Sequence, residues 1–193
     1  MIKKDAIEFI ISRLTKELPD NLYYHHVRHT LDVLEAAERI GVLEGISDEE
    51  MKLLRTAAAY HDCGYLVKYE NNEGDSVTIT RNVLPSYGYS QLEIDTICAM
   101  IDCTTIPQKP CNRLEMILCD ADLDYLGRDD FFMIGICLYR ELNEHGKTIT
   151  LKEWYHQGAS CLKVPENARQ LPGVIEEINK KYGIRLDFKN RNI

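Results

Sequence analysis

The amino-acid sequence predicts an all-α fold, a single-domain helical bundle over residues 1–193. Apolar residues recur every three or four positions along most of the chain, which is the spacing of one helix face. Capping boxes at Ser47–Glu50 and Ser90–Glu93 indicate helix starts. Alternating apolar and polar residues, typical of a half-buried strand, do not stand out, and Val77–Thr80 alone has a strand-like composition.

Most of the expected helices have a start or stop signal of their own. The first two end near Pro19 and at Gly41, because proline and glycine interrupt helices. The polar stretch 69–75 and the two-proline stretch 104–110 are expected to be loops. Thr150 starts another helix through a third capping box. The expected helices cover residues 7–14, 25–40, 47–61, 76–84, 90–101, 112–126, 129–144, a segment from 150, and 168–182.

The charge balance limits the binding partners. The chain has 23 basic and 31 acidic side chains and a net charge of −8. Duplex nucleic acid and anionic membranes bind basic surfaces, so neither is an expected partner. A small phosphorylated molecule is not excluded, because a bound cation reverses the local field.

The cysteines and the apolar runs indicate the compartment. Seven cysteines are an odd number, and they lack the spacing of a zinc knuckle, which favours free thiols in a reducing environment. The segment after Met1 has no apolar signal core, and no apolar stretch approaches membrane-spanning length. We therefore expect a cytoplasmic protein.

Two of the expected helices carry histidines that could bind a metal ion. His25 and His29 are four positions apart and would share one helix face. His61 and Asp62 follow three alanines, which allow close approach of a neighbouring helix. Adjacent helical positions differ by about 100°, so this doublet could hold an ion from two sides. The competing interpretations are core histidines bonded to backbone carbonyls and a surface aspartate.

A third segment supplies carboxylates. Asp120, Asp122 and Asp124 alternate with apolar residues, and like charges this close raise one another's pKa unless a cation neutralises them. A solvated acidic face is the alternative, although the apolar neighbours leave little room for it. Metal ions held by these groups and the histidines would activate water for phosphoester hydrolysis.

The combination resembles the HD-domain superfamily of metal-dependent phosphohydrolases, and within it a subgroup of small bacterial proteins. The resemblance covers about residues 20–135 and implies a bundle of the HD-domain type. The helical pattern predicts further C-terminal helices over 136–193. The matching segments are Tyr24-His25-(x)₃-His29-Thr30, Ala58-(x)₂-His61-Asp62-x-Gly64-Tyr65 and Asp120-Ala121-Asp122-Leu123-Asp124-Tyr125-Leu126-Gly127-Arg128.

The resemblance also implies a role for individual residues. His25 matches a histidine that protonates the leaving oxygen in phosphodiesterase-like members, which is general acid catalysis. The cofactor is one or two divalent ions (Mn, Mg, Fe, Zn or Ni). The implied metal ligands are His29, His61, Asp62 and, at the last position, Asp122 or alternatively Asp120.

One departure from the family pattern follows the HD doublet. Similar proteins often have a His-Glu pair where this chain has Asn72-Glu73. If that histidine holds a second ion, this chain binds one ion or binds the second one weakly. Glu73 could supply an oxygen ligand or hold a water molecule, and we count it with His25 and Asp62 among the catalytic candidates.

Three basic residues near these segments are candidates for binding substrate phosphate: Lys68, Lys109 and Arg128. Arginine would bind it through two parallel hydrogen bonds. For each residue, an exposed solubilising charge is the alternative.

We expect a phosphohydrolase that cleaves a phosphoester of a small molecule with a metal-activated water. A nucleotide is the first candidate substrate. A nucleotide phosphodiesterase is the more specific form of this hypothesis. The alternative is a catalytically weak nucleotide-sensing or nucleotide-binding module, which Asn72 favours. A di-iron oxygenase ranks last, because it requires more histidines near the HD doublet. A homodimer is left open.

Overall fold

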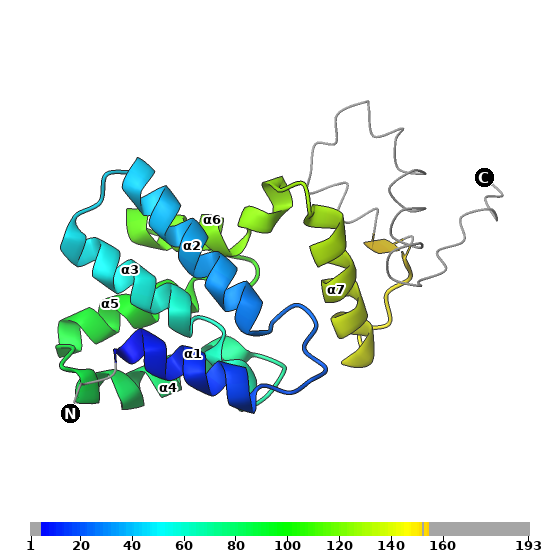
Figure 1. Cartoon of the computed structure of the whole chain (residues 1–193), viewed down its shortest axis with the longest axis horizontal. Coiled ribbons are helices and arrows are strands. Elements are labelled where there is room, and N and C mark those ends of the chain that lie inside the picture. Colours follow the sequence, from blue (N-terminus) through cyan, green and yellow to red (C-terminus); the bar gives the residue numbers. More distant parts are fainter. Residues whose placement is uncertain (1–4, 152, 155–193) are drawn as a thin grey trace. The chain divides into compact units, whose positions relative to one another are not determined.

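The computed structural model describes residues 5–151, 153 and 154, and within this range it is helical without any strand. This confirms the all-α prediction. None of the described helices is both long and apolar enough to cross a membrane. The α-helices are α1 Ala6–Glu17, α2 Val27–Leu43, α3 Asp48–Tyr60, α4 Asn72–Val83, α5 Gln91–Asp102, α6 Arg113–Asp122 and α7 Phe131–Glu144 (Figure 1), and the short 3₁₀ helices are η1 Cys63–Leu66, η2 Leu84–Tyr87 and η3 Asp124–Gly127.

The chain divides into two compact units, Met1–Lys147 and Thr148–Ile193. In the second unit, the Thr150 backbone N–H donates to the Glu153 carboxylate at 2.8 Å, and the Glu153 N–H donates to the Thr150 hydroxyl at 3.2 Å. These are the two bonds of the predicted capping box. The helix expected at 168–182 lies outside the described residues, and a single domain over the whole chain remains a prediction.

Helix α3 is the centre of the first unit. It packs against α1, α2, α5 and α6, and residues 57–60 at its C-terminal end are completely buried. Alanines at three of these four positions keep the backbones close, as the sequence predicted. The C-terminal end of α3, which carries the HD doublet, therefore lies inside the helical core.

The boundaries of α2 differ from the prediction at both ends. The His26 side chain caps the helix by accepting a hydrogen bond from the Arg28 N–H at 3.1 Å, so His25 lies before the helix. Gly41 does not stop α2. It is buried within the helix, where an added Cβ would lie 2.7 Å from the terminal carbon of Met51. The turn comes at Gly45, whose φ is +63°.

Two other predicted boundaries were wrong. Helix α4 begins at Asn72 rather than Ser76, directly after Asn71, whose φ of +52° is left-handed. Gly64 allows this early start, because an added Cβ there would lie 1.8 Å from the Asn72 carbonyl oxygen. Helix α6 ends at Asp122, and η3 replaces its expected last turn.

Candidate metal centre

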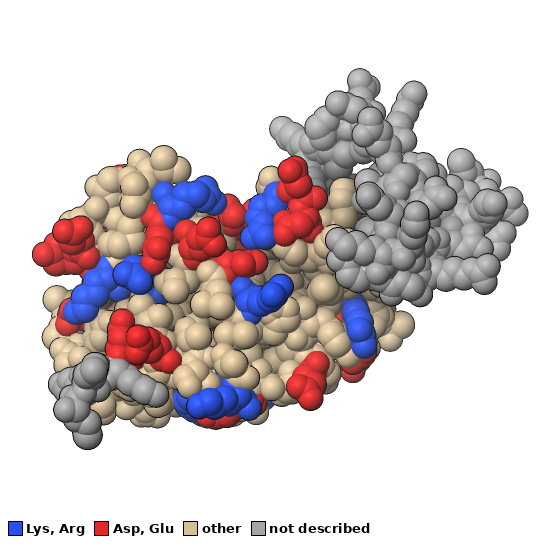
Figure 2. Space-filling view, in the orientation of Figure 1, with Lys and Arg blue, Asp and Glu red and all other residues tan. Residues whose placement is uncertain are grey.

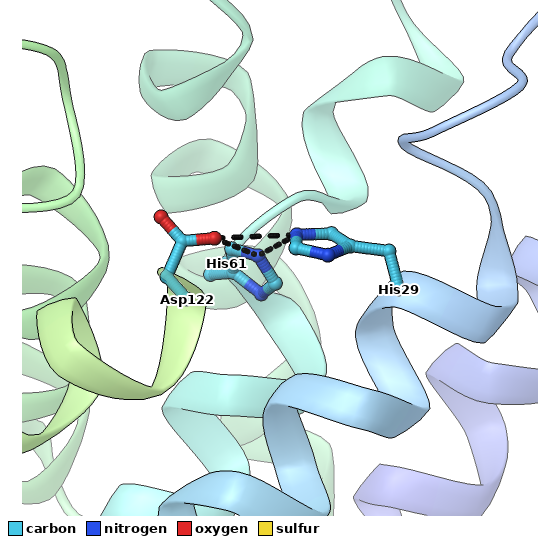
Figure 3. Close-up of side chains that lie close together, drawn as sticks. All are labelled: His29, His61 and Asp122. Atoms are coloured by element: carbon cyan, nitrogen blue, oxygen red, sulfur yellow. Dashed lines mark hydrogen bonds and ion pairs between the residues drawn. The ribbon is translucent and has the colours of Figure 1, made fainter. Parts of the chain in front are cut away.

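Three helix ends bring two imidazoles and a carboxylate together. His29 lies in the first turn of α2, His61 directly follows α3, and Asp122 is the last residue of α6. One ligand atom from each residue lies within 4.8 Å of the other two. Figure 3 shows the three side chains pointing toward a common centre. This group could hold a metal ion.

Asp62 joins the same centre. Its Oδ2 lies 3.1 Å from His61 Nε2 and 3.3 Å from His29 Nε2. Asp122 Oδ1 lies 3.2 Å from His29 Nε2 and 3.6 Å from His61 Nε2. Two carboxylate oxygens thus face the same pair of imidazole nitrogens, and the predicted convergence of the HD doublet with Asp122 is present in the structure.

The arrangement fits a divalent cation. The two Nε2 atoms are 3.3 Å apart, and two nitrogens bound tetrahedrally to one zinc ion also lie about 3.3 Å apart. Asp62 Oδ2 is buried without a well-formed hydrogen bond, as expected of an oxygen that would ligate a cation. Helices α3 and α6 both end at the site, so the negative ends of their helix dipoles lie beside it.

The pKa values of the site residues also indicate that the centre favours a positive charge. Burial disfavours the charged imidazolium of His29, but the hydrogen bonds and charges of Asp122 and Asp62 outweigh burial and raise its pKa. The pKa of His61 is raised well above its ordinary value for the same opposing reasons. Burial raises the pKa of Asp122, but the two histidines overcome it and lower that pKa to about 2. A bound cation would replace these protons.

Two further contacts orient the ligand side chains. His61 Nδ1 donates to the Ala58 carbonyl at 2.8 Å, which leaves the Nε2 lone pair directed at the centre. The Gln108 amide donates to Asp122 Oδ2 at 3.0 Å and leaves Oδ1 for the histidines. Such outer contacts fix the rotamers of metal ligands. No sequence pattern pointed to Gln108, because the loop conformation alone brings it to Asp122.

The ring of His25 is held by a carboxylate that is distant in the sequence. Glu141, on α7 and completely buried, accepts from the backbone N–H groups of Tyr24 at 2.8 Å and His25 at 3.0 Å. Its other oxygen accepts from His25 Nδ1 and from the Tyr69 hydroxyl. Although burial raises its pKa, the His25 contact and the backbone donors lower the pKa of Glu141 below its usual value. Glu141 is therefore an anionic acceptor, so His25 Nδ1 carries a proton.

His25 consequently differs from the prediction in its surroundings. It does not share a helix face with His29, because α2 starts two residues later. Its ring stacks on Tyr65 with the centroids 4.5 Å apart, and Tyr24 contacts both His25 and His29, whose own ring centroids are 5.8 Å apart. The sequence did not indicate Glu141, whose neighbours Arg140 and Glu144 are ordinary surface charges.

A small cavity of about 80 Å³ opens beside the metal centre. His29 and Asp122 form part of its wall, together with Tyr24, Tyr125 and Arg128. The Arg128 guanidinium contacts Asp130 at 2.6 Å and Asp32 at 3.3 Å, so its charge is already partly balanced. Arg128 is the predicted phosphate-binding residue that lines this cavity.

The other predicted site residues lie elsewhere. Asp120 is exposed and does not join the ligand group. Asp124, by contrast, lines the cavity and pairs with Arg39 at 2.5 Å. Lys68 pairs with Asp75 at 2.9 Å. The following residues are also outside the ligand group and the cavity wall: exposed Lys109 and half-buried Glu73.

Asn72 is buried at the start of α4. Its side-chain oxygen has no hydrogen-bond partner among the described residues. Among those residues, the ligand group at His29, His61 and Asp122 is the single group of this kind.

Comparisons with known proteins agree with this geometry. Residues 27–124, slightly more than half of the chain, match the family model of the HD domain, whose members are typically metal-dependent phosphohydrolases. The matched range contains His29, His61, Asp62 and Asp122 but ends before Glu141. No curated protein and no solved structure is significantly similar to the chain. The chain belongs to the HD-domain family.

Proposed function

We propose that this protein is a metal-dependent phosphohydrolase that cleaves a small phosphoester, with a nucleotide as the substrate class. The observation that carries the proposal is the convergence of two imidazole nitrogens and two carboxylate oxygens beside a cavity that contains an arginine. These donor types suit Zn²⁺, Mn²⁺, Fe²⁺ or Ni²⁺.

In this proposal His29, His61, Asp62 and Asp122 hold the ion. When bound, the ion acidifies a water molecule and neutralises charge on a phosphoryl oxygen. Asp62 and Asp122 each keep a second oxygen, and that of Asp122 is held by Gln108. The second oxygen of Asp62 is the one we propose as acceptor of the proton from the attacking water.

His25 is the proposed general acid. Glu141 binds Nδ1, so Nε2 lies at the opposite edge of the ring and carries the proton that passes to the leaving oxygen. Stacking on Tyr65 fixes the plane of the ring. A positioned histidine of this kind typically contributes ~10²–10⁴-fold to the rate.

The cavity supports a small substrate. Arg128 would bind a phosphoryl oxygen in exchange for part of its contact with Asp32 or Asp130, and Tyr24 and Tyr125 offer aromatic surface to a base. The face drawn in Figure 2 carries Lys and Arg side by side with Asp and Glu, which agrees with the proposal that duplex nucleic acid is not a partner. The proposed location is the cytoplasm, in line with the six free cysteines of the described residues.

One observation favours a second candidate, a catalytically weak nucleotide-binding module. The described residues form one ligand group, and Asn72 stands where a histidine for a second ion would be expected. A binuclear mechanism would then be impaired while binding survives. The same observation places a di-iron oxygenase last.

The test begins with the metal content of protein purified without chelator. We expect about one equivalent of a transition metal, and we expect turnover of nucleotide phosphoesters in the presence of Mn²⁺ that stops in the presence of chelator. His61→Ala and Asp62→Ala should lose both metal and turnover. Tight nucleotide binding without turnover, at full metal occupancy, would favour the binding module. Turnover that survives in either variant would refute the metal centre.

A further inference from the structure

Two cysteines lie against each other close to the metal centre. Cys103 caps the C-terminal end of α5 and Cys119 lies in α6, and their Sγ atoms are 3.5 Å apart. The Cys103 thiol also lies 3.0 Å from the Met100 carbonyl, and Cys119 Sγ lies 3.6 Å from the Cys103 carbonyl. Cys103 is partly exposed whereas Cys119 is buried, so a small reagent can reach the pair from one side.

The two cysteines lie at the base of the loop whose Gln108 binds Asp122. This loop runs from Cys103 to Asn112 and places the Gln108 amide on Asp122 at 3.0 Å. Asp122 follows Cys119 by three residues on the same helix. A covalent bond between the two sulfurs would therefore fix α6 to the start of the Gln108 loop.

We propose that Cys103 and Cys119 form a dithiol modification site that peroxides convert into a disulfide. One thiolate attacks a peroxide oxygen, which breaks the O–O bond and leaves a sulfenic acid and hydroxide. The second thiolate attacks that sulfur and displaces hydroxide. The balance is two thiols and one hydrogen peroxide giving one disulfide and two waters, with sulfur oxidised and peroxide reduced.

The contact between the two sulfurs also favours the thiolate form of Cys119, which the proposed reaction requires. The hydrogen bond from Cys103 lowers the pKa of Cys119, while the same contact raises that of Cys103. By contrast, Cys63 has no cysteine neighbour among its described contacts, and burial raises its pKa to about 12. Cys63 and Cys98 are matched buried thiols that should stay reduced.

The test treats the folded, full-length chain with stoichiometric hydrogen peroxide in a Cys111→Ser background, which removes the exposed cysteine of the same loop. We expect a mass loss of two hydrogens and, after trypsin, a link between the peptides that contain Cys103 and Cys119. Closing this loop should raise the Tm by roughly 5–10 °C, reversed by dithiothreitol.

Control variants separate the site from general oxidation. Cys98→Ser should retain the cross-link, and Cys103→Ser should abolish it. Cys119→Ser should also abolish the cross-link. If this variant does not fold, a second measurement is the binding of one equivalent of a trivalent arsenical to the unmodified pair, because an arsenical needs two adjacent thiols. A link to any other cysteine, over-oxidation without a link, or a cross-link that forms only in denaturant would overturn the proposal.

Discussion

Glu141 accepts hydrogen bonds from both the backbone and the ring of His25, although 116 residues separate the two in the sequence. Helix α7 therefore supplies a buried carboxylate to the segment that enters α2. This contact lies beyond the range that matches the family model. It gives the proposed general acid a fixed tautomer, because an anionic acceptor at Nδ1 requires a proton there.

Glu141→Gln is expected to reduce turnover in a way that depends on the leaving group. An amide holds His25 less firmly and no longer requires the proton on Nδ1. For an alkoxide leaving group, which needs protonation, we expect kcat to fall ~10²-fold. For p-nitrophenolate, which leaves unprotonated, the loss should be small. The measurement is kcat for both ester classes at equal metal content.

Glu144→Gln is the matched control for this prediction. Glu144 lies one turn further along α7 and binds Tyr23 and Arg140 at the surface. Its substitution should leave both rates unchanged. Equal losses of kcat for the two ester classes in Glu141→Gln would show that Glu141 serves folding rather than the proton transfer.

The Glu141 contact should also make stability depend on pH. Burial raises the pKa of Glu141, but His25 and the backbone donors lower it below the ordinary value of 4.5. A lowered folded pKa stabilises the protein fully above pH 4.5, and this contribution disappears as the pH falls through the folded pKa. Near neutral pH we expect wild type to exceed Glu141→Gln by about 1.5–3 kcal/mol in the free energy of unfolding.

Urea unfolding of both proteins at neutral pH and at several values below 4.5 measures this difference. The gap should shrink on acidification. A gap that widens toward acid would mean that Glu141 is protonated in the folded state, against the hydrogen-bond pattern described above.

Metal binding should distinguish the aspartates of α6. Asp122→Asn removes a charged ligand, so we expect loss of stoichiometric metal binding in calorimetry with Mn²⁺ or Zn²⁺. Asp120→Asn changes an exposed residue of the same helix and should bind like wild type. The opposite ranking would assign the last ligand position to Asp120.

Gln108→Ala tests the contact that orients Asp122. Loss of an outer hydrogen bond to a metal ligand typically weakens affinity by ~10–100-fold. We expect a shift of this size in the dissociation constant for metal, with little change in the circular dichroism spectrum. Lys109→Ala, in the neighbouring exposed position, is the control. Unchanged affinity in Gln108→Ala would remove this residue from the description of the site.

Two glycines offer a matched pair for stability. A Cβ at Gly64 would lie 1.8 Å from the Asn72 carbonyl oxygen, a backbone atom that cannot move aside. We expect Gly64→Ala to cost about 3 kcal/mol or more. Gly74, inside α4, has nothing within 4 Å of an added Cβ, so Gly74→Ala should gain ~0.5–1 kcal/mol. Thermal unfolding of both variants provides the comparison, and a mild effect at Gly64 would contradict the close packing of η1 on α4.

The sequence by itself determined the all-α fold and most of the residues that converge at the candidate site. Apolar periodicity and capping boxes are local signals, and for this reason α3 and α5 begin where they were predicted. The HD doublet and Asp122 were recognisable because histidines and aspartates in this order indicate a metal site. The choice between Asp120 and Asp122 was not local, since both follow the same helix pattern.

Only the tertiary structure decided which residues hold these ligands in place. Gln108 reaches Asp122 because a loop folds back on α6, and Glu141 reaches His25 because α7 lies against the segment before α2. Gly41 lies inside α2 although glycine often ends a helix. Met51 packs against it and occupies the space that a Cβ would need. In each case the deciding energy is a contact between residues distant in sequence, and no local pattern encodes such a contact.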